Sequence, residues 1–450
     1  MRPIALLALT LLTVAGSAQA QAPLSLRAAL ERAAEGSYAN RIAAGEARSR
    51  SAEALAPLKG ILPTARLESG YLRTTDPLGA FGFVLRQRTV TQAAFSPATL
   101  NDPDPAGNLV TGLVIEQPLF NADAWLGRTA ATDAREAARS AEQWTQATTA
   151  IEVVRGYWGA VLAAERVRTL EAALDAARSH QREAESMVTQ GLVTRSDALL
   201  ASVKAGEVEA ALIGARSQSR LSRRGLAVLL GTPADTAFTL PDSLPPAELV
   251  RMVTERARPD QPDRGGRADV RAAEQALSAA EADRRRAGAL YLPRLNSFGR
   301  IEWNTPGTPF GGKSAWTVGL MLSWSPFSGA SELSEGRAAS GRRMAASARA
   351  DAARAQATLE QARAADELAV ARARLDLAER AVAQAREAHR IVGRKYEGGL
   401  ASVTDLFDAA VVETSASLGY AAARHDALVA LAEQLKAAGS DLSPLLDLDN

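Results

Sequence analysis

The sequence predicts a mainly α-helical protein with transmembrane β-strands, built from a duplicated unit of two strands and one long helical hairpin. Two observations predict this fold class: the uneven use of proline and an internal repeat. No proline lies between Pro118 and Pro233, or between Pro326 and Pro444. Both stretches are rich in Ala, Arg, Glu and Leu, which form helices readily. Each stretch is therefore expected to be a long helical hairpin.

The two halves of the chain match at a constant offset of 208 residues. The Pro-Leu-Phe at 118–120 corresponds to the Pro-Phe at 326–327, and the break at Gly191 corresponds to the break at Gly399. Apolar residues spaced in sevens keep the same offset: Ala160, Val167, Leu174 and Val188, then Leu368, Leu375, Val382 and Tyr396. A seven-residue apolar repeat wraps helices around one another. The glycines are therefore expected to mark the hairpin tips.

Each hairpin is preceded by a pair of segments that alternate between apolar and polar residues. The four predicted strands cover about 64–75, 109–117, 294–304 and 315–325. In the last strand, every second residue from Trp316 to Trp324 is apolar, and Trp303 lies on the apolar face of the strand before it. About ten residues suffice for a transmembrane strand, and aromatic residues gather at membrane interfaces. We therefore expect Trp303, Trp316 and Trp324 to form an aromatic girdle. The alternative is a water-soluble hairpin buried against helices.

Four predicted strands are too few to close a barrel, which needs about eight. Open sheet edges are not tolerated in lipid, because their backbone groups would lack hydrogen-bond partners. Several chains must then share one barrel, and three copies would supply twelve strands. The strand count thus predicts a homotrimer.

The first twenty residues are expected to form an export signal. Arg2 supplies the positive charge, 4–14 the apolar stretch, and 18–20 a small-x-small cleavage site. The apolar stretch is too short to cross roughly 30 Å of hydrocarbon, which argues against an N-terminal anchor. The mature chain would begin at Gln21. Loss of Arg2 would lower the formal charge from +1 to zero, which argues against nucleic acid as a partner.

In the order of these elements, the chain resembles the TolC-like outer-membrane factor family. The resemblance rests on the strand pairs, the Pro-Leu-Phe at 118–120, the Gly-Leu hairpin tips and the repetition of the whole pattern. It implies a trimeric twelve-stranded β-barrel in outer-membrane lipid, continued by a twelve-helix α-barrel that forms a periplasmic tunnel. It also implies the exit duct of a tripartite efflux pump or type I secretion system, which conducts substrate passively through a gated tunnel. A periplasmic adaptor (membrane fusion protein) and an inner-membrane transporter of RND or ABC type would be its partners.

The predicted order of domains follows from this resemblance. The segments are a signal peptide (1–20), a first repeat (21–231), an equatorial linker (232–262), a second repeat (263–439) and a C-terminal tail (440–450). Each repeat is expected to begin with a helix, and the hairpins to span 121–231 and 328–439. The long segment 76–108 joins the first strand pair and is expected to face the outside, as long barrel loops do. It could fold into the pore mouth or be solvated.

Hairpin tips engage the adaptor in this family. The residues nominated for that contact are Gly191, Leu192, Val193, Gly399 and Leu400. Glycine permits the positive φ of a tight reversal, and an exposed leucine beside it offers an apolar contact. A turn with ordinary packing is the alternative.

Asp405 and Asp408 lie three residues apart and so share one helical face. They match the family's paired aspartates, which ring the closed tunnel entrance and would favour cations. Tyr396 matches a position that helps latch the closed tunnel, or is a core residue of its heptad; the family's arginine near the second tip is replaced by Ala401. Residues expected to cap the return helices are Ser196, Asp197 and Thr404. Capping is also the alternative role of Asp405.

No catalytic, cofactor or metal site is predicted. The segment 307–314 fits the P-loop pattern, but a strand rather than a helix is expected after it, so the phosphate cradle is lacking. The three histidines, His180, His389 and His425, are expected to be isolated on long helices. The chain has no cysteine, which excludes thiolate ligands and cysteine nucleophiles.

Two other functions compete with the channel. A periplasmic adaptor would have one helical hairpin flanked by soluble β-domains, whereas this chain has two hairpins, each preceded by alternating strands. A coiled-coil protein without a pore would leave the tryptophan-rich strands unexplained.

Overall fold

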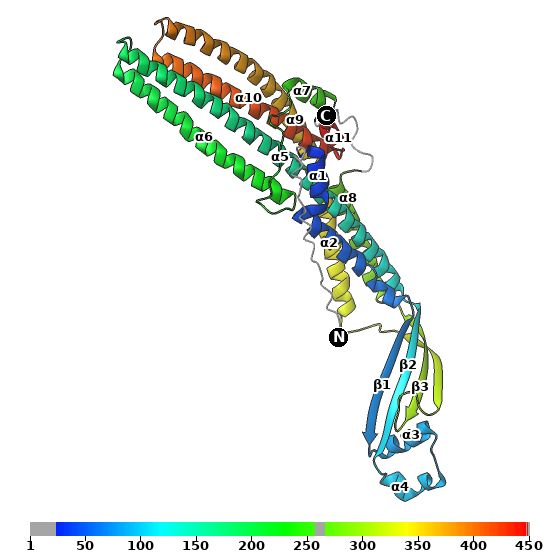
Figure 1. The fold of residues 1–450 in the computed structure, drawn as a ribbon. Coiled ribbons are helices and arrows are strands. Elements are labelled where there is room, and N and C mark those ends of the chain that lie inside the picture. Colours follow the sequence, from blue (N-terminus) through cyan, green and yellow to red (C-terminus); the bar gives the residue numbers. More distant parts are fainter. Residues whose placement is uncertain (1–23, 257–265, 447, 449–450) are drawn as a thin grey trace, which may run out of the picture. The chain divides into compact units, whose positions relative to one another are not determined.

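The computed structural model describes residues 24–256, 266–446 and 448. These residues form two compact units: one contains residues up to Arg41, 146–264 and 360 onward, and the other contains 42–145 and 265–359. The first unit holds both hairpin tips, and the second holds the sheet (Figure 1). The expected signal peptide and residues 257–262 of the expected linker lie outside the described residues.

Helices make up most of the described chain. In chain order they are α1 (Leu26–Gly36), α2 (Tyr38–Glu53), η1 (Ala56–Gly60), α3 (Pro77–Gln87), η2 (Gln92–Phe95), α4 (Pro97–Asn101), α5 (Ala122–Thr189), α6 (Arg195–Leu229), α7 (Ala247–Arg256), α8 (Ala268–Ala289), α9 (Ser331–Glu397), α10 (Val403–Ala438) and α11 (Ser443–Leu446). The longest, α5 and α9, contain 68 and 67 residues. Among the described helices, none combines the length and the apolar character that crossing a bilayer requires.

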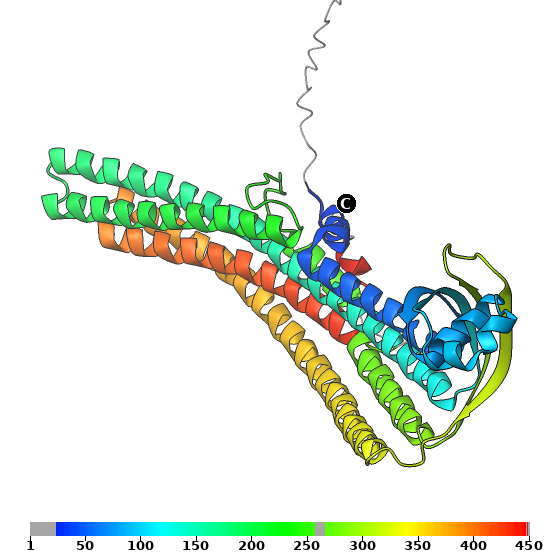
Figure 2. The ribbon, with the colours of Figure 1, turned by 90° about the horizontal axis from the view of Figure 1, so that it is seen from below.

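Within the first unit, residues 146–189 of α5 with α6, and 360–397 of α9 with α10, lie side by side (Figures 1 and 2). Their contact follows the seven-residue apolar repeat. Ala160, Leu174, Leu368 and Leu375 are at most 5 % exposed. The core of this unit also buries Tyr157, whose hydroxyl donates a hydrogen bond to the carbonyl oxygen of Leu24 at 2.8 Å. The heptad pattern thus sets which helical faces meet.

Arg424 anchors the linker to the helices. Its guanidinium pairs with Glu165 on α5 and donates a hydrogen bond to the carbonyl oxygen of Leu244 in the linker at 3.1 Å. Glu165 in turn accepts a hydrogen bond from the backbone N–H of Leu244 at 3.1 Å. The side chains of Arg424 and Glu165 are 8 % and 18 % exposed. One buried ion pair therefore joins α5, α10 and the linker.

The second unit contains one antiparallel sheet with the order β1-β2-β3-β4. Its strands are β1 (Thr64–Thr74), β2 (Ala106–Phe120), β3 (Arg294–Thr305) and β4 (Ser314–Ser323). Strands β2 and β3 pair across the two repeats, with Leu113 opposite Ile301. Within the described chain, the outer edges of β1 and β4 pair with no strand.

The sheet has one apolar and one polar face. The register places on the apolar face Leu67, Leu113, Ile115, Ile301, Trp316, Leu320 and Leu322. The opposite face, called the polar face below, carries the charged and amide residues Arg66, Glu68, Glu116, Arg300, Glu302 and Asn304, interspersed with the apolar Leu72, Val110, Val114, Phe298 and Met321. Much of this apolar face is left open by the part of the chain that the structure describes: Trp316, Leu320 and Leu322 are 76 %, 69 % and 67 % exposed.

Two segments between strands adopt structures relevant to the expectations. The P-loop-like segment 307–314 forms the turn between β3 and β4 and leads directly into a strand. The long segment 76–108 is not an irregular loop, because it contains α3, η2 and α4.

Arg424→Ala should lower the free energy of unfolding by about 3 kcal/mol, because it leaves the largely buried Glu165 without its cation and the Leu244 carbonyl without this donor. Urea unfolding of the detergent-solubilised protein would measure this. The matched control is Arg155→Ala, which removes a pair with Glu433 in which the arginine is 56 % exposed. That change should cost at most about 1 kcal/mol. Equal losses for the two variants would contradict the anchoring role of Arg424.

Candidate functional site

Both hairpins turn at a glycine in the left-handed backbone region. Gly191 has φ 72° and Gly399 has φ 70°. The next residue closes each turn: the N–H of Leu192 donates to the carbonyl oxygen of Met187, and that of Leu400 to Lys395. The two leucine side chains stay in solvent, 66 % and 82 % exposed. Each tip therefore presents one leucine whose side chain is mostly exposed to solvent in the single chain.

The same capping box starts both return helices. The Thr194 hydroxyl accepts a hydrogen bond from the N–H of Asp197 at 3.3 Å, and the N–H of Thr194 donates to the Asp197 carboxylate at 2.9 Å. The hydroxyl of Ser402 and the carboxylate of Asp405 make the equivalent bonds at 3.1 and 2.8 Å. Because Thr194 and Ser402 are 208 residues apart, the cap is part of the internal repeat.

The expected caps therefore need correction. Thr194 and Ser402 are the N-cap residues, whereas Ser196 and Thr404 already lie within α6 and α10. Asp197 does take part in a cap, but from the third helical position. A capping box needs a hydroxyl and a carboxylate three residues apart, and this spacing in the sequence was the signal that the expectation missed.

Asp405 and Asp408 are both exposed at the start of α10, while Leu406 and Phe407 between them point into the core. The two carboxylates therefore share the solvent face of the helix. Hydrogen bonds from Ser402, first from its side chain and then from its backbone, lower the pKa of Asp405. Asp405 is thus held ionised by the cap, and Asp408 is the exposed carboxylate without a part in it.

Tyr396 lies in a small apolar core near the tips. The buried members of this core are Ala177, Ala184, Ala201, Ala205, Tyr396, Val403, Leu406 and Phe407, from all four long helices. Tyr396 is 4 % exposed, and its hydroxyl is buried without a hydrogen-bond partner. Burial, and then the charges of Glu183 and Asp197, raise its pKa. In the single chain, Tyr396 therefore packs as a core residue between the hairpins.

Two histidines are not isolated, contrary to expectation. The rings of His180 on α5 and His389 on α9 lie 6.1 Å apart between centroids, and Nδ1 of His389 is 2.6 Å from Glu413 on α10. Phe407 packs edge-on against His180 at 6.1 Å. The repeat could have revealed this pair, because His180 corresponds to residue 388 and thus lies level with His389.

The histidine pair borders a cavity of about 520 Å³ between the hairpins. Burial is the main cause that lowers the pKa of His180; Glu183 opposes this effect and His389 adds to it. His425 lies elsewhere, with Nδ1 3.0 Å from Asp426. Across the residues that the structure describes, no group of three or more potential metal ligands comes together.

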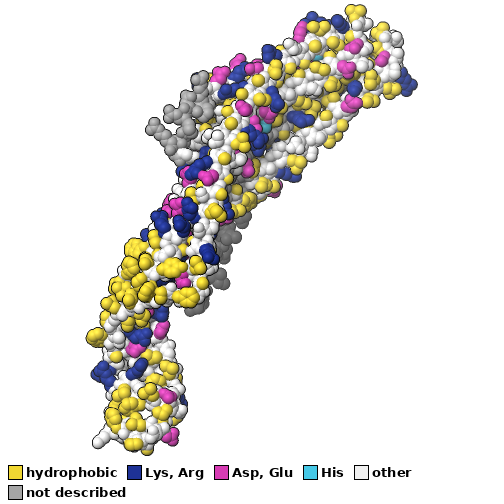
Figure 3. Space-filling model, turned by 180° about the vertical axis from the view of Figure 1, so that it is seen from behind, with side chains coloured by type: hydrophobic (Ala, Val, Ile, Leu, Met, Phe, Trp, Pro, Cys, Tyr) yellow, Lys and Arg dark blue, Asp and Glu magenta, His cyan; other side chains and the backbone are white. Residues whose placement is uncertain are grey.

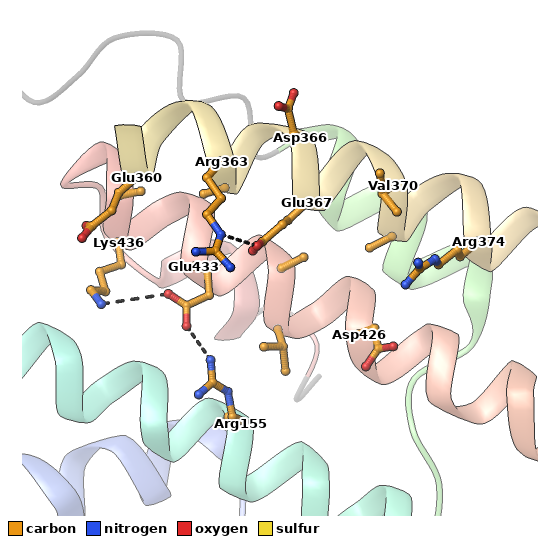
Figure 4. A pocket seen from close by; sticks show the side chains of 15 residues that line it. Arg155, Glu360, Arg363, Asp366, Glu367, Val370, Arg374, Asp426, Glu433 and Lys436 are labelled. Carbon is orange, nitrogen blue, oxygen red and sulfur yellow. Dashed lines mark hydrogen bonds and ion pairs between the residues drawn. The ribbon is translucent and has the colours of Figure 1, made fainter. Parts of the chain in front are cut away.

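A second cavity, of about 690 Å³, lies between α5, α9 and α10 (Figure 4). Charged side chains of both signs line it, and most pair locally. Glu433 pairs with Arg155 at 2.7 Å and Lys436 at 4.0 Å, and Arg363 pairs with Glu367 at 2.8 Å. The side chains form a charged groove in which the ion pairs join α5 to α10 and successive turns of α9 to each other.

Exposed apolar side chains gather over the unit that contains the sheet (Figure 3). The three predicted girdle tryptophans lie at its two ends. Trp303 and Trp316 lie near the β3–β4 turn, and Trp324 directly follows β4 and donates a hydrogen bond to the carbonyl oxygen of Tyr291 at 3.1 Å. Eight residues of strand between Trp316 and Trp324 span roughly 26 Å, close to the apolar band of about 25 Å on outer-membrane barrels.

Comparison with known proteins agrees with this geometry. The sequence profile of the outer membrane efflux protein family matches residues 79–232 and 264–440, which is more than half of the chain. The chain therefore belongs to the outer membrane efflux protein family. It is an outer-membrane transport protein of the TolC-like type, with its helical part in the periplasm. A comparison with curated protein sequences found no match.

Solved structures share the fold at low sequence identity. The outer membrane protein VceC from Vibrio cholerae is 21 % identical, with a TM-score of 0.74 over 92 % of this chain and 96 % of that one. The CmeC outer membrane channel of Campylobacter jejuni is 14 % identical, with a TM-score of 0.74 over 94 % and 89 %. The MtrE outer membrane channel of Neisseria gonorrhoeae, in its open state, is 19 % identical, with a TM-score of 0.73 over 93 % and 90 %. These relatives are channels or membrane proteins rather than enzymes.

Acidification should weaken the packing around His180. Because its pKa is lowered on folding, its stabilising contribution is complete above the ordinary histidine pKa of about 6.5 and is lost as the pH falls through the folded value. His180→Gln should therefore reduce the drop in Tm between about pH 7.5 and about pH 5.5. Gln181→Ala, one residue away, removes no titratable group and should keep the full drop. An unchanged drop in His180→Gln would refute the role of this histidine.

Proposed function

We propose that three copies of this chain form the outer-membrane exit duct of a tripartite efflux pump or a type I secretion system. The duct would conduct substrate passively through a gated tunnel, from a periplasmic adaptor and an inner-membrane RND or ABC transporter to the outside. The observation that carries this proposal is the amphipathic four-stranded sheet with two unpaired edges, attached to paired helical hairpins in a family of outer-membrane efflux proteins.

The sheet supports a shared barrel for two reasons. Its apolar face is wide and uncovered, which suits contact with lipid rather than water. The edge groups of β1 and β4 need partners in lipid, and β4 of one copy can supply them to β1 of the next. Three copies give twelve strands with the polar face inward. The adaptor and pore-free coiled-coil alternatives offer no role for such a sheet.

The helices offer a matching contact between copies. Exposed apolar residues follow one another along α6 and α9: Leu199, Val203, Ile213, Leu221 and Val228 on the first, and Val370, Leu377 and Ile391 on the second. In the part of α9 that belongs to the first unit, Val370, Leu377 and Ile391 are separated by seven and fourteen residues, as in a coiled-coil seam. We infer that α6 of one copy packs on α9 of its neighbour beside the charged groove of Figure 4, which would continue the trimer as a twelve-helix tunnel.

The native mass of the protein extracted from outer membranes in mild detergent tests the oligomer. A species of about three times the chain mass that falls to monomer on boiling is the expected result, since closed barrels resist detergent until heated. A soluble periplasmic monomer would overturn the barrel and the duct together.

The gate belongs to the same proposal. We place Asp405 and Asp408 on the ring that narrows the periplasmic entrance. Since Asp405 is held by its cap with Ser402, Asp408→Ala should weaken cation block of the reconstituted channel with little effect on helix stability. Asp405→Ala should also weaken the start of α10, because it removes the carboxylate half of the capping box with Ser402. Cation block that survives both substitutions together would exclude the ring.

Tyr396 is proposed to hold the gate by packing the two hairpins together. Tyr396→Phe keeps the buried ring and removes only the hydroxyl. Because the proposed role of Tyr396 is packing, this variant should leave channel closure intact. Tyr396→Ala should raise spontaneous opening in bilayer recordings, because it leaves a cavity worth about 3 kcal/mol between the hairpins. Opening by Tyr396→Phe alone would instead assign the latch to the hydroxyl.

The tips are proposed to contact the adaptor through Leu192 and Leu400, beside Gly191, Val193 and Gly399. Both leucines are exposed, so Leu192→Asp with Leu400→Asp should leave the amount of trimer unchanged and abolish efflux. The minimal inhibitory concentration of a pump substrate in cells would measure the loss. Leu221→Asp is the matched control away from the tips, where trimer yield rather than adaptor binding should suffer. An unchanged minimal inhibitory concentration in the tip variant would contradict the proposed contact with the adaptor.

A further inference from the structure

Helix α3 covers the polar face of the sheet at the end where β1 passes to β2. The amide nitrogen of Gln87 donates hydrogen bonds to the carbonyl oxygen of Gly107 at 2.8 Å and to the side chain of Asn108 at 3.0 Å. Asn108 donates in turn to the side chain of Asn304 on β3 at 2.8 Å. Asn108 and Asn304 point to the polar face, yet they are only 1 % and 2 % exposed. Figure 1 shows α3 beside the end of the strands, with α4 beyond it.

The segment around α3 is folded and fixed at both ends. The Asp76 carboxylate caps the helix by accepting a hydrogen bond from the N–H of Gly79. After the helix, Arg88 donates a hydrogen bond to the carbonyl oxygen of Ser314 at the start of β4, at 3.2 Å. Phe81 on α3 packs edge-on against Phe95 at 5.6 Å. Helix α3 is therefore held across the sheet from β2 to β4.

The two sides of α3 differ in burial. Ala80 is 3 % exposed and lies seven residues before Gln87, so both belong to the side that meets the sheet. Leu78 and Leu85 are also seven residues apart and are 82 % and 49 % exposed. At about 100° per residue, the leucines point roughly 160° away from Ala80 and Gln87. The apolar side of α3 thus points away from the sheet.

The lumen of a closed twelve-stranded barrel would be nearly filled by three copies of α3. Twelve strands about 4.8 Å apart and tilted by about 40° enclose a ring of roughly 24 Å between backbones. A helix with its side chains is about 10 Å across. Three helices on the inner wall would together span the ring, and their outward-pointing leucines would be directed at its axis.

We propose that α3 is an outer plug: in the trimer, three copies of Pro77–Gln87 close the outer mouth of the lumen, with Leu78 and Leu85 of each copy in contact with those of its neighbours. The inference rests on the proposed trimeric barrel with its polar face inward. In this proposal, the surface that covers the exposed leucines of α3 belongs to a second copy of this chain. The hydrogen bonds of Gln87 to Gly107 and Asn108 hold the plug on the wall.

Disulfide trapping tests the contact, because the chain has no cysteine of its own. In outer membranes, oxidation of Leu78→Cys should produce a disulfide-linked dimer on denaturing gels. The control is Leu67→Cys on the apolar, lipid-facing side, where the leucine is 60 % exposed, against 82 % for Leu78. It should remain monomeric on the gel.

Bilayer recordings test the closure. Leu78→Asp with Leu85→Asp should place six repelling charges at the axis and raise single-channel conductance by about twofold or more. The control is Leu72→Asp, which adds a charge to the polar face on β1 and should not do so. Native mass is measured on the same samples. A stable trimer in which Leu78→Cys forms no disulfide would overturn the plug but not the duct. The same holds if the disulfide forms but Leu78→Asp with Leu85→Asp leaves the conductance unchanged. Absence of a trimer would overturn both the plug and the duct.

Discussion

The unpaired edges of one amphipathic sheet impose the constraint on which the rest of the structure depends. Four strands with an apolar face cannot be stable alone in lipid, because the edge strands β1 and β4 would leave backbone groups without partners. Inserting a single copy into lipid would cost free energy, because the backbone groups of these two edges would have no hydrogen-bond partners. In the proposed barrel, the need to close the sheet gives a reason for several copies, and the contact of the apolar face with lipid puts the polar face inside.

The internal repeat explains why the two hairpins are so alike. Gly191 and Gly399 share a left-handed conformation, and the caps at Thr194 and Ser402 share one set of hydrogen bonds. Duplication has kept the elements that decide where a helix stops and where the next begins. The second repeat alone carries an additional exposed carboxylate, Asp408, beside its cap, so the two tips have the same structure but not the same charge.

Side-chain contacts between distant helices were harder to predict than the helices themselves. His180 and His389 were expected to be isolated, because no local spacing links them. They meet because α5 and α9 run at the same level in the repeat. The prediction of Ser196 and Thr404 as caps is wrong, because capping propensity alone does not distinguish neighbouring hydroxyl residues. What identifies the cap is a hydroxyl with a carboxylate three residues later, as in Thr194 with Asp197 and Ser402 with Asp405. The segment 76–108 gave no periodic signal for α3, whose packing on the polar face depends on Asn108 and Asn304 from two strands far apart in the chain.

The sequence by itself determined the duplicated order of strands and hairpins. Apolar period, proline positions and tip glycines are local properties, and strand β1 starts at the residue expected from them, Thr64, and ends within one residue of the expected end. Only the tertiary structure decided which residues meet: Arg424 with Glu165 and the linker, Tyr396 with the tip core, and Gln87 with the polar face of the sheet. These contacts join segments separated by tens to hundreds of residues, and they depend on helix rotation and strand register. A local pattern indicates which face of a helix or strand is buried, but it does not say which residues of a distant element that face meets.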